Sequence, residues 1–133
     1  MSDPRQSAVQ ELAALPIFVE VPNRELEEML TRAQRRTYRA DETIFRAGDP
    51  PAFLYYIISG EIGVSLTSDD RRINVSRLGP GRLLGIHTIF DDGPQFLSGT
   101  ALTQTTVLAI AKSDVLAMLR RHPETLLRLG VAG

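Results

Sequence analysis

The sequence predicts a mainly β domain with flanking helices, and three features of the 133-residue chain lead to this expectation. Apolar residues recur at helical spacing near both ends of the chain. The middle consists of short segments rich in β-forming residues, separated by turns that contain glycine and proline. Strands do not alternate with long helices, so a sandwich or roll of strands is expected in place of a parallel α/β sheet.

Two helices are predicted at the start of the chain. The first covers about residues 6–15, where apolar residues repeat at helical spacing up to Pro16. The second covers about residues 23–33, with Asn23 as its N-cap. Acidic residues follow in its first turn, where the helix dipole favours carboxylates.

The β region is predicted over about residues 35–111. Residues 53–59 form a strong strand pattern, and residues 61–66 alternate apolar and polar side chains. Residues 67–71 are polar and predict a hairpin turn into a return strand. A further strand is expected over residues 102–111.

The end of the chain is predicted to be helical over about residues 113–129. Ser113 is expected to cap the first of these C-terminal helices, and Pro123 to start the second. Gly130 would then end it. No linker or internal repeat is visible, so residues 1–133 are expected to form a single domain.

Composition excludes several classes of function. The formal net charge is -1, without the basic excess that nucleic-acid binding normally shows. The chain has no cysteine, which excludes disulfides, thiolate catalysis and iron–sulfur clusters. The first ten residues do not resemble a signal peptide, and the longest apolar run is too short to span a bilayer. We therefore expect a cytoplasmic protein without membrane contact.

Three motifs carry a family resemblance. Residues 44–49 read Ile-Phe-Arg-Ala-Gly-Asp, residues 56–60 read Tyr-Ile-Ile-Ser-Gly, and residues 78–81 read Leu-Gly-Pro-Gly, followed by Gly85. In this order they resemble the cyclic-nucleotide-binding domain that Crp/Fnr regulators share with regulatory subunits of cyclic-nucleotide-dependent kinases and channels. The resemblance implies a β-roll, also described as a double-stranded β-helix or jelly roll. It further implies the sensor domain of a bacterial transcription regulator of the Crp/Fnr type.

The resemblance also locates a phosphate-binding cassette, and this chain departs from its pattern. In the family, a glutamate directly after the cassette glycine holds the ribose hydroxyl, and an arginine further along contacts the cyclic phosphate. Those positions hold Ile86 and Gln95 here. Hydrogen bonds to charged groups contribute about 1.5–3 kcal/mol each, so losing two weakens binding by roughly a hundredfold to ten-thousandfold. We expect cyclic AMP and cyclic GMP to bind weakly or not at all.

The replaced cassette is apolar, which leaves two interpretations open. One is a sensor for a different, more hydrophobic small-molecule effector. The other is a ligandless protein-interaction domain, in which Ile86, Ile89 and Phe96 fill the former pocket. The candidate ligand-binding residues are Leu83, Gly85, Ile86, His87, Thr88, Gln95, Phe96 and Leu97.

His87 adds a third interpretation, a haem-based gas or redox sensor. In carbon-monoxide-sensing haem regulators of this superfamily, a Met-His pair at this place supplies a haem ligand, and Ile86-His87 is the equivalent pair here. Those regulators also use a cysteine, which this chain lacks. The cofactor therefore stays unknown apart from haem, and no ordinary metal site is expected. The second histidine, His122, precedes a proline in a turn typical of the family, which implies a structural role.

Catalysis is not expected. The chain has no His-x-His motif of the kind that cupin enzymes use, and the paired carboxylates Asp91 and Asp92 lie in a turn sequence. The resemblance instead implies that the cassette, residues 83–97, moves against the C-terminal helices when a ligand binds. It also implies a homodimer through those helices. The family's DNA-binding helix-turn-helix is not found in this sequence, so the chain alone is not expected to bind DNA.

Overall fold

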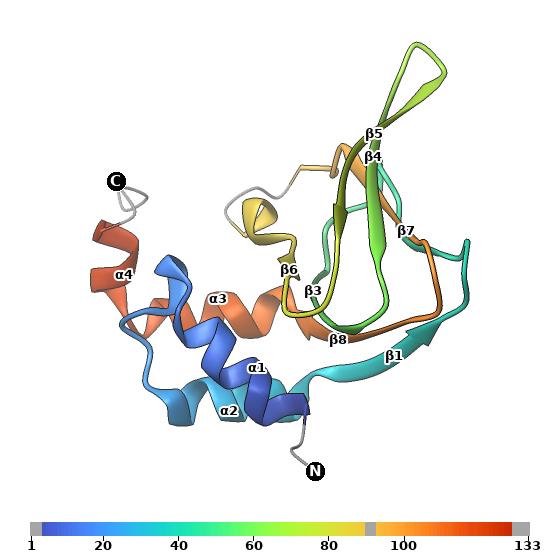
Figure 1. The fold of residues 1–133 in the computed structure, drawn as a ribbon. Coiled ribbons are helices and arrows are strands. Elements are labelled where there is room, and N and C mark those ends of the chain that lie inside the picture. The colour runs from blue at the N-terminus through green and yellow to red at the C-terminus, as the bar shows by residue number, and fades with distance from the viewer. Residues whose placement is uncertain (1–3, 90–92, 129–133) are drawn as a thin grey trace.

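The computed structural model describes residues 4–89 and 93–128, and it shows a roll of short strands with helices gathered at one end (Figure 1). The helices are α1 (Pro4–Ala13), η1 (Pro16–Phe18), α2 (Asn23–Arg32), η2 (Ile86–Thr88), α3 (Lys112–Arg120) and α4 (Pro123–Arg128). The strands are β1 (Gln34–Tyr38), β2 (Thr43–Phe45), β3 (Phe53–Ser59), β4 (Ile62–Ser68), β5 (Arg71–Leu78), β6 (Leu83–Leu84), β7 (Leu97–Ala101) and β8 (Thr105–Ala111).

The strands form two antiparallel sheets. Their orders are β1-β8-β3-β6 and β2-β7-β4-β5. Strands that are distant in sequence lie side by side, as in the pairing of β3 with β8 and of β4 with β7. This arrangement is a jelly roll with flanking helices, which confirms the predicted fold class.

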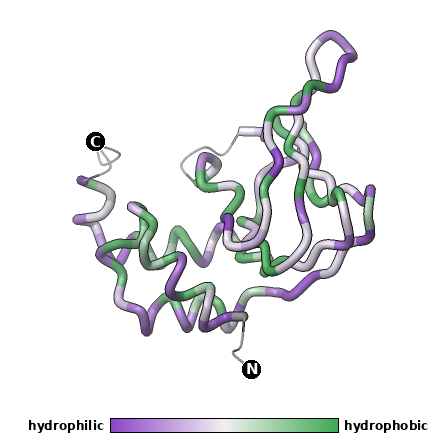
Figure 2. Tube along the Cα trace, viewed as in Figure 1, coloured by the Kyte–Doolittle hydropathy of each residue, from purple (hydrophilic) through white to green (hydrophobic). Residues whose placement is uncertain are grey.

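Strands β3 and β8 separate two hydrophobic cores. Leu54, Tyr56 and Ile110 pack against the helices, in a cluster that includes residues of α1, α2 and α3. Their neighbours Ile57 and Val107 point into the interior of the roll. Because both faces of these strands are covered, β3 consists almost entirely of large apolar and aromatic residues. The tip of the β4–β5 hairpin, which extends away from both cores, is hydrophilic (Figure 2).

The helix starts differ from the prediction. Asn23 is the first residue of α2, and Pro22 is the N-cap, whose carbonyl oxygen accepts hydrogen bonds from two amides of the first turn. In the same way, Ala111 and not Ser113 precedes α3. Neither helix has a side-chain cap, so the expectations for Asn23 and Ser113 were wrong. The first helix begins and ends two residues earlier than expected.

The strand boundaries differ from the prediction. Strand β8 begins at Thr105, three residues after the expected start at residue 102. The hairpin turn between β4 and β5 is shorter than predicted and consists of Asp69 and Asp70, both with positive φ. This is the geometry of a two-residue type I′ turn, which twists with its strands. The sequence also did not predict β7. The expected turn at Asp91-Asp92 and the helix end at Gly130 lie outside the described residues.

In the described part of the chain, none of the helices is long and apolar enough to cross a bilayer.

Candidate functional site

A pocket of about 220 Å³ opens into the roll beside β6 and η2. Most of the sequence-predicted site residues line it: Leu83, Gly85, Ile86, His87, Gln95 and Leu97. The rest of its wall comes from the strands: Phe45, Phe53, Tyr55, Val64, Ser76, Leu78 and Leu84. The cassette segment and the interior of the roll therefore form one site.

Gly85 shapes the cassette. Its φ of 102° is a left-handed conformation that glycine adopts easily, and it turns the chain from β6 into η2. The backbone amide and the hydroxyl of Thr88 both donate to the Gly85 carbonyl oxygen, at 2.9 and 2.6 Å. Thr88 is buried and does not line the pocket. Thr88 therefore closes the turn that follows Gly85.

Gln95 is fixed through its backbone. Its amide donates to the Asp49 carbonyl oxygen at 3.1 Å, and its carbonyl oxygen accepts from the Gly48 amide at 2.7 Å. The Gly-Asp turn that carried part of the family resemblance thus holds the segment where the family has its arginine. The half-buried side chain of Gln95 lines the pocket.

His87 and Phe96 lie at the outer side of the site. His87 is exposed and lines the pocket, and its ring centroid is 5.9 Å from that of Phe96. Phe96 is 65% exposed and is not part of the pocket wall. Ile89 is buried in the helical core. Of the three side chains considered as fillers of the pocket, only Ile86 lines it, and it leaves the pocket open.

Apart from His87, the described side chains that line the pocket are all uncharged. Within residues 4–89 and 93–128, no arginine, lysine, aspartate or glutamate lines it. The Phe45 and Tyr55 rings stack with centroids 5.5 Å apart, and the Phe53 ring lies 6.3 Å from that of Tyr55. Burial raises the pKa of the Tyr55 hydroxyl, so this group stays neutral at physiological pH. The site offers aromatic surface and neutral hydrogen-bonding groups.

Sequence reasoning missed the strand residues of the wall. Alternation along β4 identifies Val64 as an inward position, and this signal could have placed it in the pocket. Ser76 could not be found in this way. The register shifts between Val64 and Ser65, so that Val64 pairs with Ser76 while Ser65 pairs with Asn74. Such an irregularity moves side chains from one face to the other.

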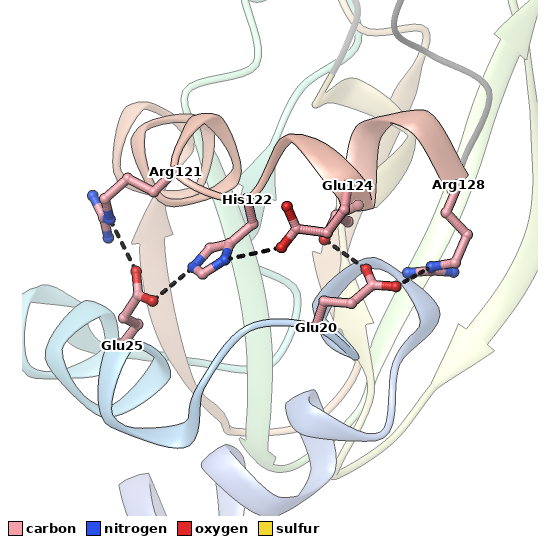
Figure 3. A network of polar contacts seen from close by, with 7 residues as sticks. Glu20, Glu25, Arg121, His122, Glu124 and Arg128 are labelled. Atoms are coloured by element: carbon pink, nitrogen blue, oxygen red, sulfur yellow. Dashed lines mark hydrogen bonds and ion pairs between the residues drawn. The ribbon is translucent and has the colours of Figure 1, made fainter.

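A second polar cluster joins the C-terminal helices to the N-terminal segment, and we call it the helix clamp (Figure 3). Glu25 of α2 accepts from Arg121 Nε at 2.9 Å and contacts His122 Nε2 at 2.6 Å. Glu20 accepts from Arg128 Nε at 2.7 Å and from the Thr125 hydroxyl at 2.8 Å. The clamp consists of Glu20, Glu25, Arg121, His122, Glu124, Thr125 and Arg128.

The clamp carboxylates are held in their charged form. The hydrogen bond from Arg121, together with His122, keeps the pKa of Glu25 below its ordinary value, although burial opposes this. The bond from Arg128 does the same for Glu20. His122 thus takes part in holding α2 against α3, the structural role that its turn implied. A groove of about 560 Å³ beside it is lined by charges of both signs.

Among the described residues, no three histidine, aspartate or glutamate side chains lie close enough together to hold a metal ion.

Three comparisons with known proteins bear on the site. Residues 35–122 match the family described as "Cyclic nucleotide-binding domain". The cyclic AMP receptor protein of Thermus thermophilus is 33% identical over 109 residues, which cover 81% of this chain and 50% of that protein. The N-terminal domain of a transcriptional regulator from Streptomyces coelicolor A3(2) has a TM-score of 0.74 at 32% identity, covering 89% of this chain and 85% of that one.

The sensor domain of the transcriptional regulator DNR from Pseudomonas aeruginosa shares the fold. Its TM-score is 0.82 at 17% identity, covering 94% of this chain and 85% of that one. The chain spans about half the length of the curated relatives it matches.

Proposed function

The chain belongs to the cyclic nucleotide-binding domain family, and we propose that it is a Crp/Fnr-type regulatory sensor domain whose pocket does not bind cyclic nucleotides in the usual way. The charge of the pocket is the observation that carries this proposal. Ile86 and Gln95 stand where the family has a glutamate and an arginine, and no arginine, lysine, aspartate or glutamate of the described residues lines the pocket. A cyclic phosphate would enter without a counter-charge, which is costly in an apolar site.

An open pocket favours a ligand-binding role over a ligandless interaction domain. Ile89 is 1% exposed and packs in the helical core, and Phe96 is turned to solvent. Neither side chain fills the space. We therefore propose a small-molecule effector in place of a purely structural module. This is a binding role and not a catalytic one.

The proposed mechanism links the pocket to the helices through the cassette. Leu83 and Ile86 line the pocket and also pack against the hydrophobic cluster that includes Val115 and Met118 of α3. A ligand that touches these two side chains would shift the balance between two arrangements of the C-terminal helices. Dimerisation through those helices would carry the signal, and DNA binding would need a domain other than this one.

Calorimetric titration with cyclic AMP tests the proposal. The wild-type protein is expected to give no binding at micromolar concentrations. The double variant Ile86→Glu, Gln95→Arg restores both family anchors and is expected to gain about a hundredfold to ten-thousandfold in affinity. Gln34→Arg adds the same positive charge at an exposed position of β1 that does not line the pocket, and it is expected to leave the affinity for cyclic AMP unchanged. Micromolar binding of cyclic AMP by the wild type would refute the proposal.

Haem is the second candidate, because His87 lies at an apolar pocket. The residues do not fit it well. The pocket's 220 Å³ is below the roughly 300–1,000 Å³ of sites for drug-sized ligands, and a porphyrin is a large ligand by that standard. A Soret band that forms on addition of hemin and is lost in His87→Ala would favour haem as the ligand of this pocket.

A further inference from the structure

We propose that the pocket selects a small, flat, uncharged molecule with one hydrogen-bonding group, which Gln95 holds. This inference rests on the proposed function and names the ligand class for the same site. It follows from four properties of the pocket: its charge, its aromatic wall, the anchoring of Gln95 and its size.

Apart from the exposed His87 at its outer side, the wall offers no counter-charge to an ionic ligand. An anion would find no arginine or lysine among the described lining residues, and a cation would find no carboxylate. Burying an unpaired charge in such surroundings is strongly unfavourable. The Tyr55 hydroxyl is kept neutral by burial and does not supply a charge.

The shape of the wall favours a flat ligand. Phe45 and Tyr55 stack with an interplanar angle of 16°, and Phe53 adjoins Tyr55 at 47°. These three rings come from β2 and β3 and form one side of the pocket. Aromatic rings pack well with another ring in offset or edge-on geometry.

Gln95 supplies a placed polar group. Both of its backbone hydrogen bonds go to the Gly48–Asp49 turn, at 2.7 and 3.1 Å. The backbone that carries the side chain is therefore held at the pocket wall without a ligand, so no backbone ordering is needed there when one binds. A neutral amide both donates and accepts, so it pairs with a hydroxyl, an N–H group or a carbonyl.

The size of the pocket limits the ligand to one or two rings. About 220 Å³ is less than the roughly 300 Å³ at which sites for drug-sized molecules begin. A nucleotide, with its base, sugar and phosphate, needs a larger volume than this. The inferred ligand is thus chemically remote from a cyclic nucleotide in charge and in size.

Nuclear magnetic resonance titration with indole and benzoate tests the inference. The two probes are similar in size, but indole is neutral and benzoate carries a charge. Indole is expected to shift the signals of the Gly85 amide and the Gln95 side-chain amide and to bind at least about tenfold more tightly than benzoate. Gln95→Leu keeps both backbone hydrogen bonds and is expected to weaken indole binding about two- to tenfold.

A pair of leucine variants supplies the matched control. Leu97→Glu places a carboxylate in the pocket wall and is expected to abolish indole binding. Leu127→Glu makes the same change at a side chain that is 66% exposed on α4, away from the pocket, and is expected to bind like the wild type. If Leu97→Glu does not fold, as judged by circular dichroism, the comparison of the two probes on the wild type decides.

Three results would overturn the inference: benzoate binding as tightly as indole, no indole shifts at Gly85 and Gln95, or equal indole binding by the two leucine variants. A parallel titration with cyclic AMP separates this failure from that of the proposed function. If neither indole nor cyclic AMP binds, the ligand class is wrong while the loss of nucleotide binding still holds. If cyclic AMP binds at micromolar concentration, the proposed function itself is wrong.

Discussion

Replacing Glu25 by glutamine is expected to loosen the helix clamp that holds α3 and α4 against α2. Glu25 is the shared partner of Arg121 and His122, at 2.9 and 2.6 Å (Figure 3). Glutamine has nearly the same shape and keeps one oxygen acceptor. The substitution therefore removes the negative charge and one of the two accepted hydrogen bonds, with little change in packing.

The two contacts of Glu25 differ in strength. The Arg121 side chain is 54% exposed, and exposed ion pairs contribute about 0.2–1 kcal/mol. The side chains of His122 and Glu25 are 14% and 16% exposed, and a hydrogen bond to a charged group contributes about 1.5–3 kcal/mol where solvent is largely excluded. Since glutamine retains part of this, we expect the free energy of unfolding to fall by about 1–2 kcal/mol. The melting temperature should fall by roughly 3–10 °C.

Urea unfolding followed by circular dichroism at pH 7 measures this loss. Glu27→Gln is the matched control, because Glu27 lies on the same helix and is exposed, and we expect it to change the unfolding free energy by less than about 0.5 kcal/mol. Equal effects of the two substitutions would show that the clamp does not stabilise the domain. A double-mutant cycle with His122→Ala would assign the loss to the histidine contact.

Three further predictions concern the stability of the domain. The pKa values of Glu20 and Glu25 lie below the ordinary 4.5. The two charged carboxylates therefore stabilise the fold above that pH, and this stabilisation is lost as pH falls through the lower folded-state pKa values. The urea concentration at the unfolding midpoint should decrease below pH 4.5, and it should decrease less steeply in Glu25→Gln. Gly60→Ala should cost more than about 2 kcal/mol, because φ is +88° and a Cβ would lie 2.4 Å from a backbone oxygen, whereas Gly79→Ala, with nothing within 4 Å, should be nearly neutral by the same assay. Arg5→Ala should lower the melting free energy by about 1–2 kcal/mol, because the Arg5 guanidinium donates to two carbonyl oxygens at the end of α2; an unchanged thermal transition would contradict this.

The order of helices and strands was largely readable from the sequence, because it depends on local patterns. Strand β3 is buried on both faces, and for this reason its sequence gives a strong strand pattern. Strand β7 was missed for an identifiable reason. It contains Gly99, and a Cβ there would lie 2.3 Å from the Phe45 ring, so the strand gives up side-chain alternation to let the ring approach. Small residues of this kind do not give a strand signal.

The candidate site was only partly predictable. The cassette residues are close in sequence, and the family resemblance identified them. The opposite wall includes Phe45, Tyr55 and Ser76, which come from three different strands. Their meeting depends on the sheet register, including the shift beside Val64. The hydrophobic pattern and the turn set the register of a hairpin, but no residue type in the sequence marks the position of this bulge.

Strand β3 gives a physical reason to expect that the pocket and the helices respond together. Its residues alternate between the two sides: Tyr55 lies in the pocket wall, while Leu54 and Tyr56 face the helices. The Tyr56 hydroxyl donates to Glu11 of α1 at 2.8 Å, and burial raises its pKa, so the donor proton stays in place. A ligand that displaces Tyr55 therefore moves a strand whose other face holds α1 by a hydrogen bond and the helical core by close packing. Because close-packed cores shift between discrete arrangements and do not deform smoothly, a small change in the pocket is expected to reach the C-terminal helices as a change in their packing.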